Sequence, residues 1–175
     1  SDLVSLADRF ERFGALAQAE ALYRQALRHE PDDARLWACL GRVCRALGHH
    51  DEAIDSFRRT LSLRPGQVEL HNDLGVALME QGRLTEAVAS FREAIGLCPD
   101  DAEAHNNLGI ALASQGEPRE AAECYRHALR LKPDHHAACR NLGSILAAQG
   151  EHQNAAACFR RAVQLRPDFA LAWLE

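Results

Sequence analysis

Residues 68–101 read VELHNDLGVALMEQGRLTEAVASFREAIGLCPDD, and this stretch contains two helical patterns separated by a glycine. Apolar residues of the first half recur at the spacings that place them on one face of an α-helix. They are Leu70, Leu74, Ala77 and Leu78. Val88, Phe91 and Ile95 form a second stripe of this kind. Gly82 lies between the stripes, where a helix end favours a residue that tolerates a left-handed backbone. The stretch therefore predicts two consecutive helices.

The same 34-residue pattern recurs along the whole chain without an insertion. Its end is marked by Pro31, Pro65, Pro99, Pro133 and Pro167, and its middle by Gly14, Gly48, Gly82, Gly116 and Gly150. Proline cannot continue a helix, and an aspartate follows it where the next helix needs an N-cap, as at Asp32 and Asp100. We expect a single array, 1–175, with units 1–33, 34–67, 68–101, 102–135 and 136–169, and the start of a sixth helix pair or a capping helix at 170–175.

Small and aromatic residues at fixed repeat positions predict how the helices pack. The small set is Gly41, Gly75, Gly109 and Gly143 with Ala53, Ala87, Ala121 and Ala155. We expect these positions to be where two helices approach closely. Phe57, Phe91 and Tyr125 recur at one position of the second helix and are expected to fill the space towards the next unit.

The motif of the second unit resembles the tetratricopeptide repeat (TPR) signature. It reads Trp37-x-x-Leu40-Gly41-x-x-Cys44, then Ala53-x-x-x-Phe57 and Pro65, with Cys44 where tyrosine is usual. The resemblance covers essentially the whole chain, with Ala7 in place of the usual glycine of the first unit. It implies an all-α fold, an α-solenoid of tandem helix-turn-helix units forming a right-handed superhelix. It also implies a concave groove, lined mainly by the first helix of each pair.

Groove positions can be read from the register of the first helices. The expected peptide-binding residues are Arg42, Arg45, Asn72, Asp73, Asn106, Asn107, Ile110, Arg140, Asn141 and Ser144. Asparagines form a polar column among them, and each amide offers one acceptor and two donors. Such a column can bond the C=O and N–H groups of an extended peptide, while Arg42, Arg45 and Arg140 would attract carboxylates.

Two other interpretations of the column stay open. An asparagine on a helix can instead bond its neighbouring helix or face water. The column also resembles the asparagine ladder in the repeats of O-linked N-acetylglucosamine transferases, which holds extended protein substrates; here Cys39 and Asp73 interrupt it. Repeats that bind the acidic tails of heat-shock chaperones carry a set of Lys or Asn, Asn, and Lys or Arg across three units. Asn107 and Asn141 are in place here, but the Lys and Arg that should accompany them are missing, so that partner is disfavoured.

Composition and motifs exclude several classes of function. The 20 Lys and Arg against 25 Asp and Glu give a net charge of −5, which argues against nucleic-acid binding. No apolar run approaches the ~20 residues that span a membrane. The six cysteines contain no Cys-x-x-Cys pair, which favours reduced thiols and a cytoplasmic location.

No catalytic or cofactor motif is present, so we expect neither an enzyme nor a cofactor. His135, His136 and Cys139 lie close together, but a zinc site normally needs three or four ligands at suitable spacing, and no fourth ligand is apparent. His49 and His50 are judged in the same way, and no metal site is expected.

The sequence therefore predicts a protein–protein interaction scaffold that binds a segment of a partner protein in the concave groove. One alternative is the substrate-recruiting TPR region of a larger enzyme, such as a glycosyltransferase. Another is a structural module that self-associates through its C-terminal end at Trp173 and Leu174. Because the chain stops part-way into a repeat, we expect it to be a fragment of a longer protein.

Overall fold

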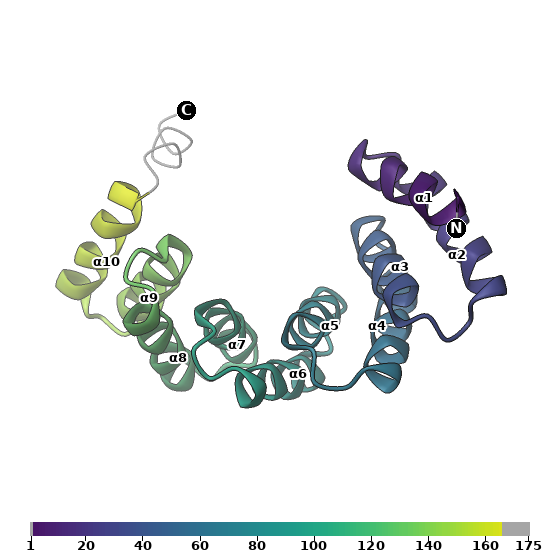
Figure 1. Cartoon of the computed structure of the whole chain (residues 1–175). Helices are drawn as coiled ribbons and strands as arrows, with labels where there is room; N and C mark the ends of the chain where they lie inside the picture. The colour runs from purple at the N-terminus through teal and green to yellow at the C-terminus, as the bar shows by residue number, and fades with distance from the viewer. Residues whose placement is uncertain (1, 166–175) are drawn as a thin grey trace. The chain divides into compact units, whose positions relative to one another are not determined.

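The computed structural model describes residues 2–165, which form ten α-helices and no strands (Figure 1). They are α1 (Asp2–Arg12), α2 (Leu16–His29), α3 (Ala34–Ala46), α4 (His50–Leu63), α5 (Val68–Glu80), α6 (Leu84–Leu97), α7 (Ala102–Ser114), α8 (Pro118–Leu131), α9 (His136–Ala148) and α10 (His152–Leu165). Each odd-numbered helix pairs with the helix that follows it. The all-α prediction of repeated helix pairs is confirmed.

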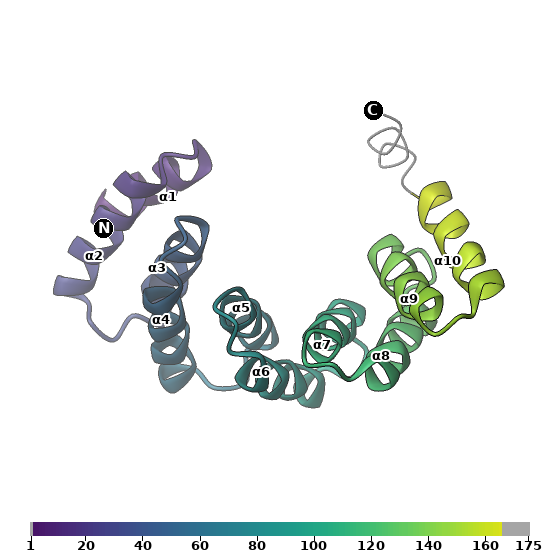
Figure 2. The ribbon, with the colours of Figure 1, turned by 180° about the vertical axis from the view of Figure 1, so that it is seen from behind.

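The chain divides into two compact units, Ser1–Leu97 with α1–α6 and Cys98–Glu175 with α7–α10. Inside a unit, each second helix packs on its own first helix, and α2, α4 and α8 also pack on the first helix of the next pair. In the first unit, α1, α3 and α5 form one layer and α2, α4 and α6 the other, as Figures 1 and 2 both show. In the second unit, α7 and α9 are layered in the same way on α8 and α10. This stacking buries faces that a single pair would leave exposed.

In the four pairs from α3–α4 to α9–α10, the aromatic ring of the second helix lies against the glycine of the first helix. A Cβ added to Gly75 would be 2.5 Å from Phe91 Cε1, and one added to Gly109 would be 2.6 Å from Tyr125 Cε1. The close approach predicted at these glycines is confirmed. The rings, however, pack back onto their own pair rather than only towards the next unit. The missing side chain of the glycine creates the space that the ring fills.

Gly82 ends α5 in the left-handed conformation that the sequence predicts, with φ 77°. Its N–H donates to the carbonyl of Met79, and the N–H of Arg83 donates to the carbonyl of Leu78, both at 2.9 Å. These two bonds satisfy carbonyls that the helix end would otherwise leave without partners. The turn therefore directs the chain from α5 into α6.

The N-caps lie one residue later than the sequence suggested. Oδ1 of Asp101 accepts from the backbone N–H groups of Glu103 at 3.0 Å and Ala104 at 3.3 Å. Asp33 caps α3 in the same way, so the expectation for Asp32 and Asp100 is wrong. The N–H of Asp101 bonds the carbonyl of Cys98, which places Asp100 inside the preceding turn rather than at the start of the helix.

Replacing Asp101 by alanine should lower the free energy of unfolding by about 1 kcal/mol, since α7 loses its cap. Asp100→Ala removes the same charge from the neighbouring position and should change stability by less than about 0.5 kcal/mol. Urea unfolding followed by circular dichroism measures both. Equal losses in the two variants would show that net charge, not capping, explains the effect.

Candidate protein-binding surface

A cleft of about 730 Å³ lies between α1 and α3 in the first unit, and we call it the charged cleft. Its lining residues are Asp8, Glu11, Arg12, Arg35, Ala38, Cys39 and Arg42. Opposite charges face one another across it: Arg35 lies 3.3 Å from Asp8 and Arg42 lies 3.7 Å from Glu11. Arg42 is thus the predicted groove residue that lines this cleft, and it lies close to an acidic side chain of α1.

The hydroxyl of buried Tyr23 holds the two acidic residues of the charged cleft, Asp8 and Glu11, in position. It lies 2.7 Å from both Asp8 Oδ1 and Glu11 Oε2, and it donates its one proton to either carboxylate. Burial raises the pKa of Tyr23, and its hydrogen bonds to the two carboxylates raise it further. The phenol therefore remains a neutral donor that holds both acids in place.

Arg45 and Asp73 extend the charged surface from α3 to α5. Arg45 Nη1 lies 3.2 Å from Glu80 Oε1, so the guanidinium already has an acidic partner. Burial raises the pKa of Asp73, and the nearby cations Arg45 and Arg42 partly offset this effect. A partner carboxylate would therefore compete with Glu80 for Arg45.

The second unit carries three connected asparagines, Asn106, Asn107 and Asn141, which we call the amide chain. Asn141 Nδ2 on α9 donates to Asn106 Oδ1 on α7 at 3.1 Å. Asn106 Nδ2 donates in turn to Asn107 Oδ1 at 3.5 Å. Asn106 is only 2% exposed, whereas Asn107 and Asn141 are partly exposed. Asn106 therefore positions its two neighbours, which have the accessible amides.

The ten predicted groove residues are divided between the two units. Arg42, Arg45, Asn72 and Asp73 belong to the first unit; Asn106, Asn107, Ile110, Arg140, Asn141 and Ser144 belong to the second. Around the amide chain, Ile110 is partly exposed and Arg140 is exposed. Ser144 Oγ donates to the carbonyl of Arg140 at 3.2 Å. Backbone, amide, apolar and cationic groups are thus all present on the α7–α9 layer.

The histidines of the second unit have structural partners that the sequence did not identify. His135 caps α9 through Nδ1, and its Nε2 lies 3.0 Å from Glu103 Oε2. His105 stacks on His127 with ring centroids 4.1 Å apart. The sequence contained one indication of the role of His105, because this residue takes the repeat position of Trp37. In the structure both side chains lie within hydrogen-bonding distance of a proline carbonyl.

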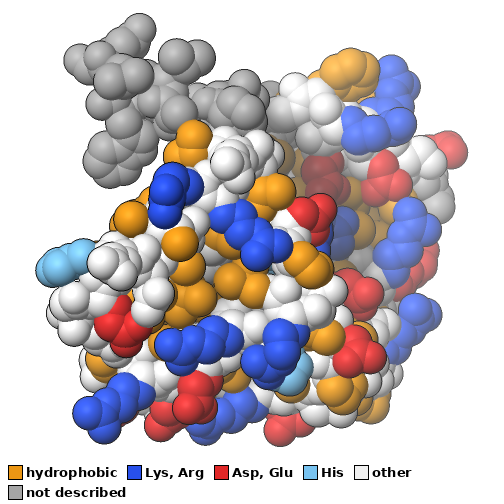
Figure 3. Space-filling view, turned by 90° about the vertical axis from the view of Figure 1, so that its left-hand side faces the viewer, with side chains coloured by type: hydrophobic (Ala, Val, Ile, Leu, Met, Phe, Trp, Pro, Cys, Tyr) orange, Lys and Arg blue, Asp and Glu red, His pale blue; other side chains and the backbone are white. Residues whose placement is uncertain are grey.

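Figure 3 shows the side of the second unit on which α10 lies. Blue Lys and Arg side chains stand among red acidic and orange hydrophobic ones on this face. Val163 of α10 is 44% exposed. The predicted self-association residues Trp173 and Leu174 lie outside the described part of the chain.

Tandem 34-residue helix pairs, four of them with an aromatic ring on a glycine, define a TPR protein. Residues 3–173 match the model of one TPR family, the cilia and flagella-associated protein 70 C-terminal domain. The chain belongs to this family. A sequence comparison with curated proteins found no match.

Several solved structures share the fold. A crystal structure of MamA superimposes with a TM-score of 0.85 at 24% identity, covering 94% of this chain and 96% of MamA. For pilF of Pseudomonas aeruginosa the TM-score is 0.82 at 24% identity, with 93% of this chain and 74% of that chain covered. YrrB, described as a TPR protein with an unusual peptide-binding site, gives 0.78 at 25% identity, with 98% and 88% covered. The likeness to the asparagine ladder of O-linked N-acetylglucosamine transferases is not specifically shown by these structures and stays a prediction.

Within residues 2–165, no helix combines the length and apolar character needed to cross a bilayer.

Proposed function

We propose that this chain is a non-catalytic scaffold that binds an extended segment of a partner protein on the α7–α9 layer. The amide chain carries the proposal, because it presents two partly exposed amides held by a third, buried amide. The family and fold are those of TPR scaffolds, and YrrB is described as having a peptide-binding site.

Asn107 and Asn141 have the chemistry to bond the main chain of a peptide. The bond to Asn106 uses one of the two N–H groups of Asn141, and the amide also has a carbonyl oxygen. A bound peptide must replace the hydrogen bonds that it loses from water. Because Asn106 already orients Asn141, less side-chain entropy is lost on binding.

The flanking residues indicate which side chains the segment carries. Exposed Arg140 suits an acidic side chain, and partly exposed Ile110 suits an apolar one. In the first unit the charged cleft presents both signs of charge, which suits a segment of mixed charge. The family name makes a component of cilia or flagella a candidate for the partner.

Replacing both Asn107 and Asn141 by alanine should weaken peptide binding about tenfold or more, since two hydrogen bonds of about 1 kcal/mol each are lost. Peptides selected from a random displayed library serve as the probe, and calorimetric titration measures their affinity. Asn154→Ala is the control, because Asn154 on α10 bonds exposed Glu151 and lies outside the amide chain. Unchanged affinity in the double variant, with circular dichroism showing an intact fold, would exclude the amide chain as the binding site.

A further inference from the structure

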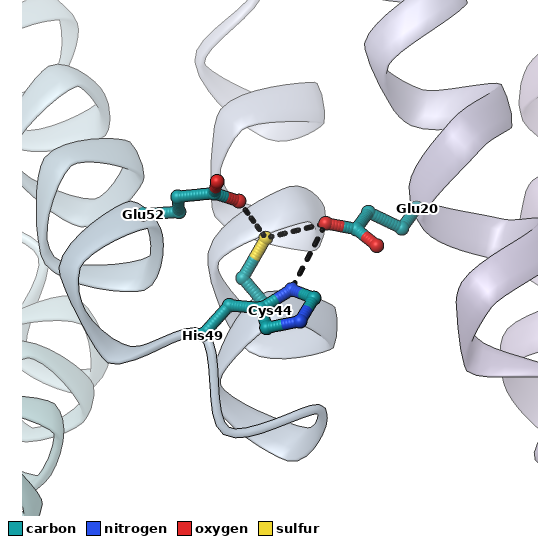
Figure 4. A group of neighbouring side chains, drawn as sticks. All are labelled: Glu20, Cys44, His49 and Glu52. Atoms are coloured by element: carbon teal, nitrogen blue, oxygen red, sulfur yellow. Dashed lines mark hydrogen bonds and ion pairs between the residues drawn. The ribbon is translucent and has the colours of Figure 1, made fainter.

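Four side chains that can bind a metal converge in the first unit, as Figure 4 shows. Glu20 comes from α2, Cys44 from α3, His49 from the residue before α4, and Glu52 from the first turn of α4. One ligand atom from each lies within 4.8 Å of all the others. We call these four residues the ligand cluster. The sequence did not reveal this cluster, because Glu20 lies 24 residues before Cys44 and the nearby residues alone offer too few ligands.

Three distances inside the ligand cluster are close to those around a tetrahedral zinc ion. Cys44 Sγ lies 3.6 Å from Glu20 Oε1 and 3.9 Å from Glu52 Oε2. His49 Nδ1 lies 3.3 Å from Glu20 Oε1. Zinc bonds of about 2.0–2.3 Å in a tetrahedron separate neighbouring ligand atoms by about 3.3–3.8 Å. An ion therefore fits between these atoms once Arg24, which contacts both carboxylates, has moved away.

The other repeats show that two of the four ligands replace apolar core residues. Glu20 occupies the repeat position of Ile54, Val88 and Ala122, and Cys44 occupies that of Leu78, Leu112 and Leu146, all buried. Glu20 is only 9% exposed and Cys44 is fully buried. A buried carboxylate is costly unless a cation or several hydrogen bonds compensate it. Both exceptions to the apolar pattern fall in one place, where they face each other.

Arg24 is the cation that faces the ligand cluster in the structure. Its Nη2 lies 2.8 Å from Glu20 Oε1 and also contacts Glu52 Oε2. The pair of Arg24 with Glu52 recurs one repeat later as Arg58 with Glu86, at 2.8 Å, where neither a thiol nor a buried carboxylate is present. That ion pair therefore does not require Glu20 or Cys44. The Arg24 side chain is 49% exposed, so it has room to turn away into solvent.

We propose that Glu20, Cys44, His49 and Glu52 bind a zinc-like transition-metal ion, and that Arg24 leaves the two carboxylates when the ion enters. Thiolate and imidazole together favour zinc over magnesium or calcium. Four protein ligands complete a tetrahedron, as in structural zinc sites. Because the ligands come from three helices and the turn before α4, the ion would tie the first two helix pairs together. The inference does not depend on the peptide-binding proposal.

The test uses Co²⁺ as a spectroscopic probe of the chelator-treated chain. Wild type should show a thiolate-to-cobalt charge-transfer band and the intense visible bands of a tetrahedral ion, and Zn²⁺ should abolish both. The double variant Glu20→Ile with Cys44→Leu should show neither band. This variant restores the residue types of the other repeats, so it is expected to fold. Zn²⁺ should raise the Tm of wild type and leave that of the variant unchanged.

Two further variants act as controls. Cys98→Ser removes a thiol outside the ligand cluster and should keep the cobalt bands. Arg24→Ala removes the competing cation and should tighten Zn²⁺ binding roughly two- to fivefold, the range expected for the loss of an exposed ion pair. The proposal is overturned if wild type shows no thiolate band, if the band persists in the double variant, or if Zn²⁺ leaves the Tm of wild type unchanged. Weaker binding by Arg24→Ala would overturn the role given to Arg24.

Discussion

Gly75→Ala is expected to lower the free energy of unfolding by about 1–3 kcal/mol, the cost typical of overpacking a core. The added methyl group would lie 2.5 Å from Phe91 Cε1 and 2.7 Å from Cζ. Phe91 is fully buried, so its ring can move only by displacing other core residues. The substitution should therefore destabilise the chain, although alanine has a higher helix propensity than glycine.

Gly96→Ala is the matched control for this effect. Gly96 also lies in a helix, α6, but a Cβ there would meet nothing within 4 Å. Its replacement should raise stability by up to about 1 kcal/mol, because glycine is a poor helix former. Urea unfolding monitored by circular dichroism compares the two variants directly. If Gly75→Ala is also stabilising, the ring and the glycine are not in the close contact described above.

Phe57→Ala should cost about 3–5 kcal/mol, as is typical when a buried phenyl ring is deleted. Phe57 is fully buried, and its ring lies against Gly41 of the same pair. The truncation leaves a cavity beside a glycine that has no side chain to fill it. Because repeats are stabilised mainly by their neighbours, the loss should extend to the adjoining helix pairs.

Phe13→Ala tests whether burial is the cause. Phe13 is 82% exposed, so the same deletion of a phenyl ring should change stability by less than about 0.5 kcal/mol. Unfolding midpoints in urea give the difference, and hydrogen exchange shows whether the helices next to α4 lose protection. Equal effects at the two positions would mean that loss of the ring, irrespective of packing, governs stability.

The repeat period, the helix pairs and the turn glycines could be predicted because they depend on local backbone chemistry. Gly82 permits a left-handed turn and Pro99 ends a helix, each near its own position, wherever the rest of the chain lies. The N-cap at Asp101 was missed by one residue, because the turn that ends at its N–H is set by backbone bonding rather than by residue type.

The side-chain networks could be predicted only in part. The register placed Asn107 and Asn141 at equivalent positions, but their link through Asn106 depends on side-chain rotamers. Glu20 and Cys44 are 24 residues apart, and their proximity depends on the packing of α2 against α3. The sequence did contain an indication of the cluster, since Glu20 and Cys44 stand at repeat positions that carry apolar residues in the later units. Comparing each repeat position across the five units would have identified it.

The contact between ring and glycine has an evolutionary consequence. It lies inside a single pair, so each 34-residue copy from the second to the fifth contains the parts that set the distance between its own two helices. A gene encoding such copies can therefore gain or lose them whole, by duplication or recombination, without changing the geometry of those that remain. Substitutions on the first helices are then free to diversify what the lengthened or shortened chain recognises.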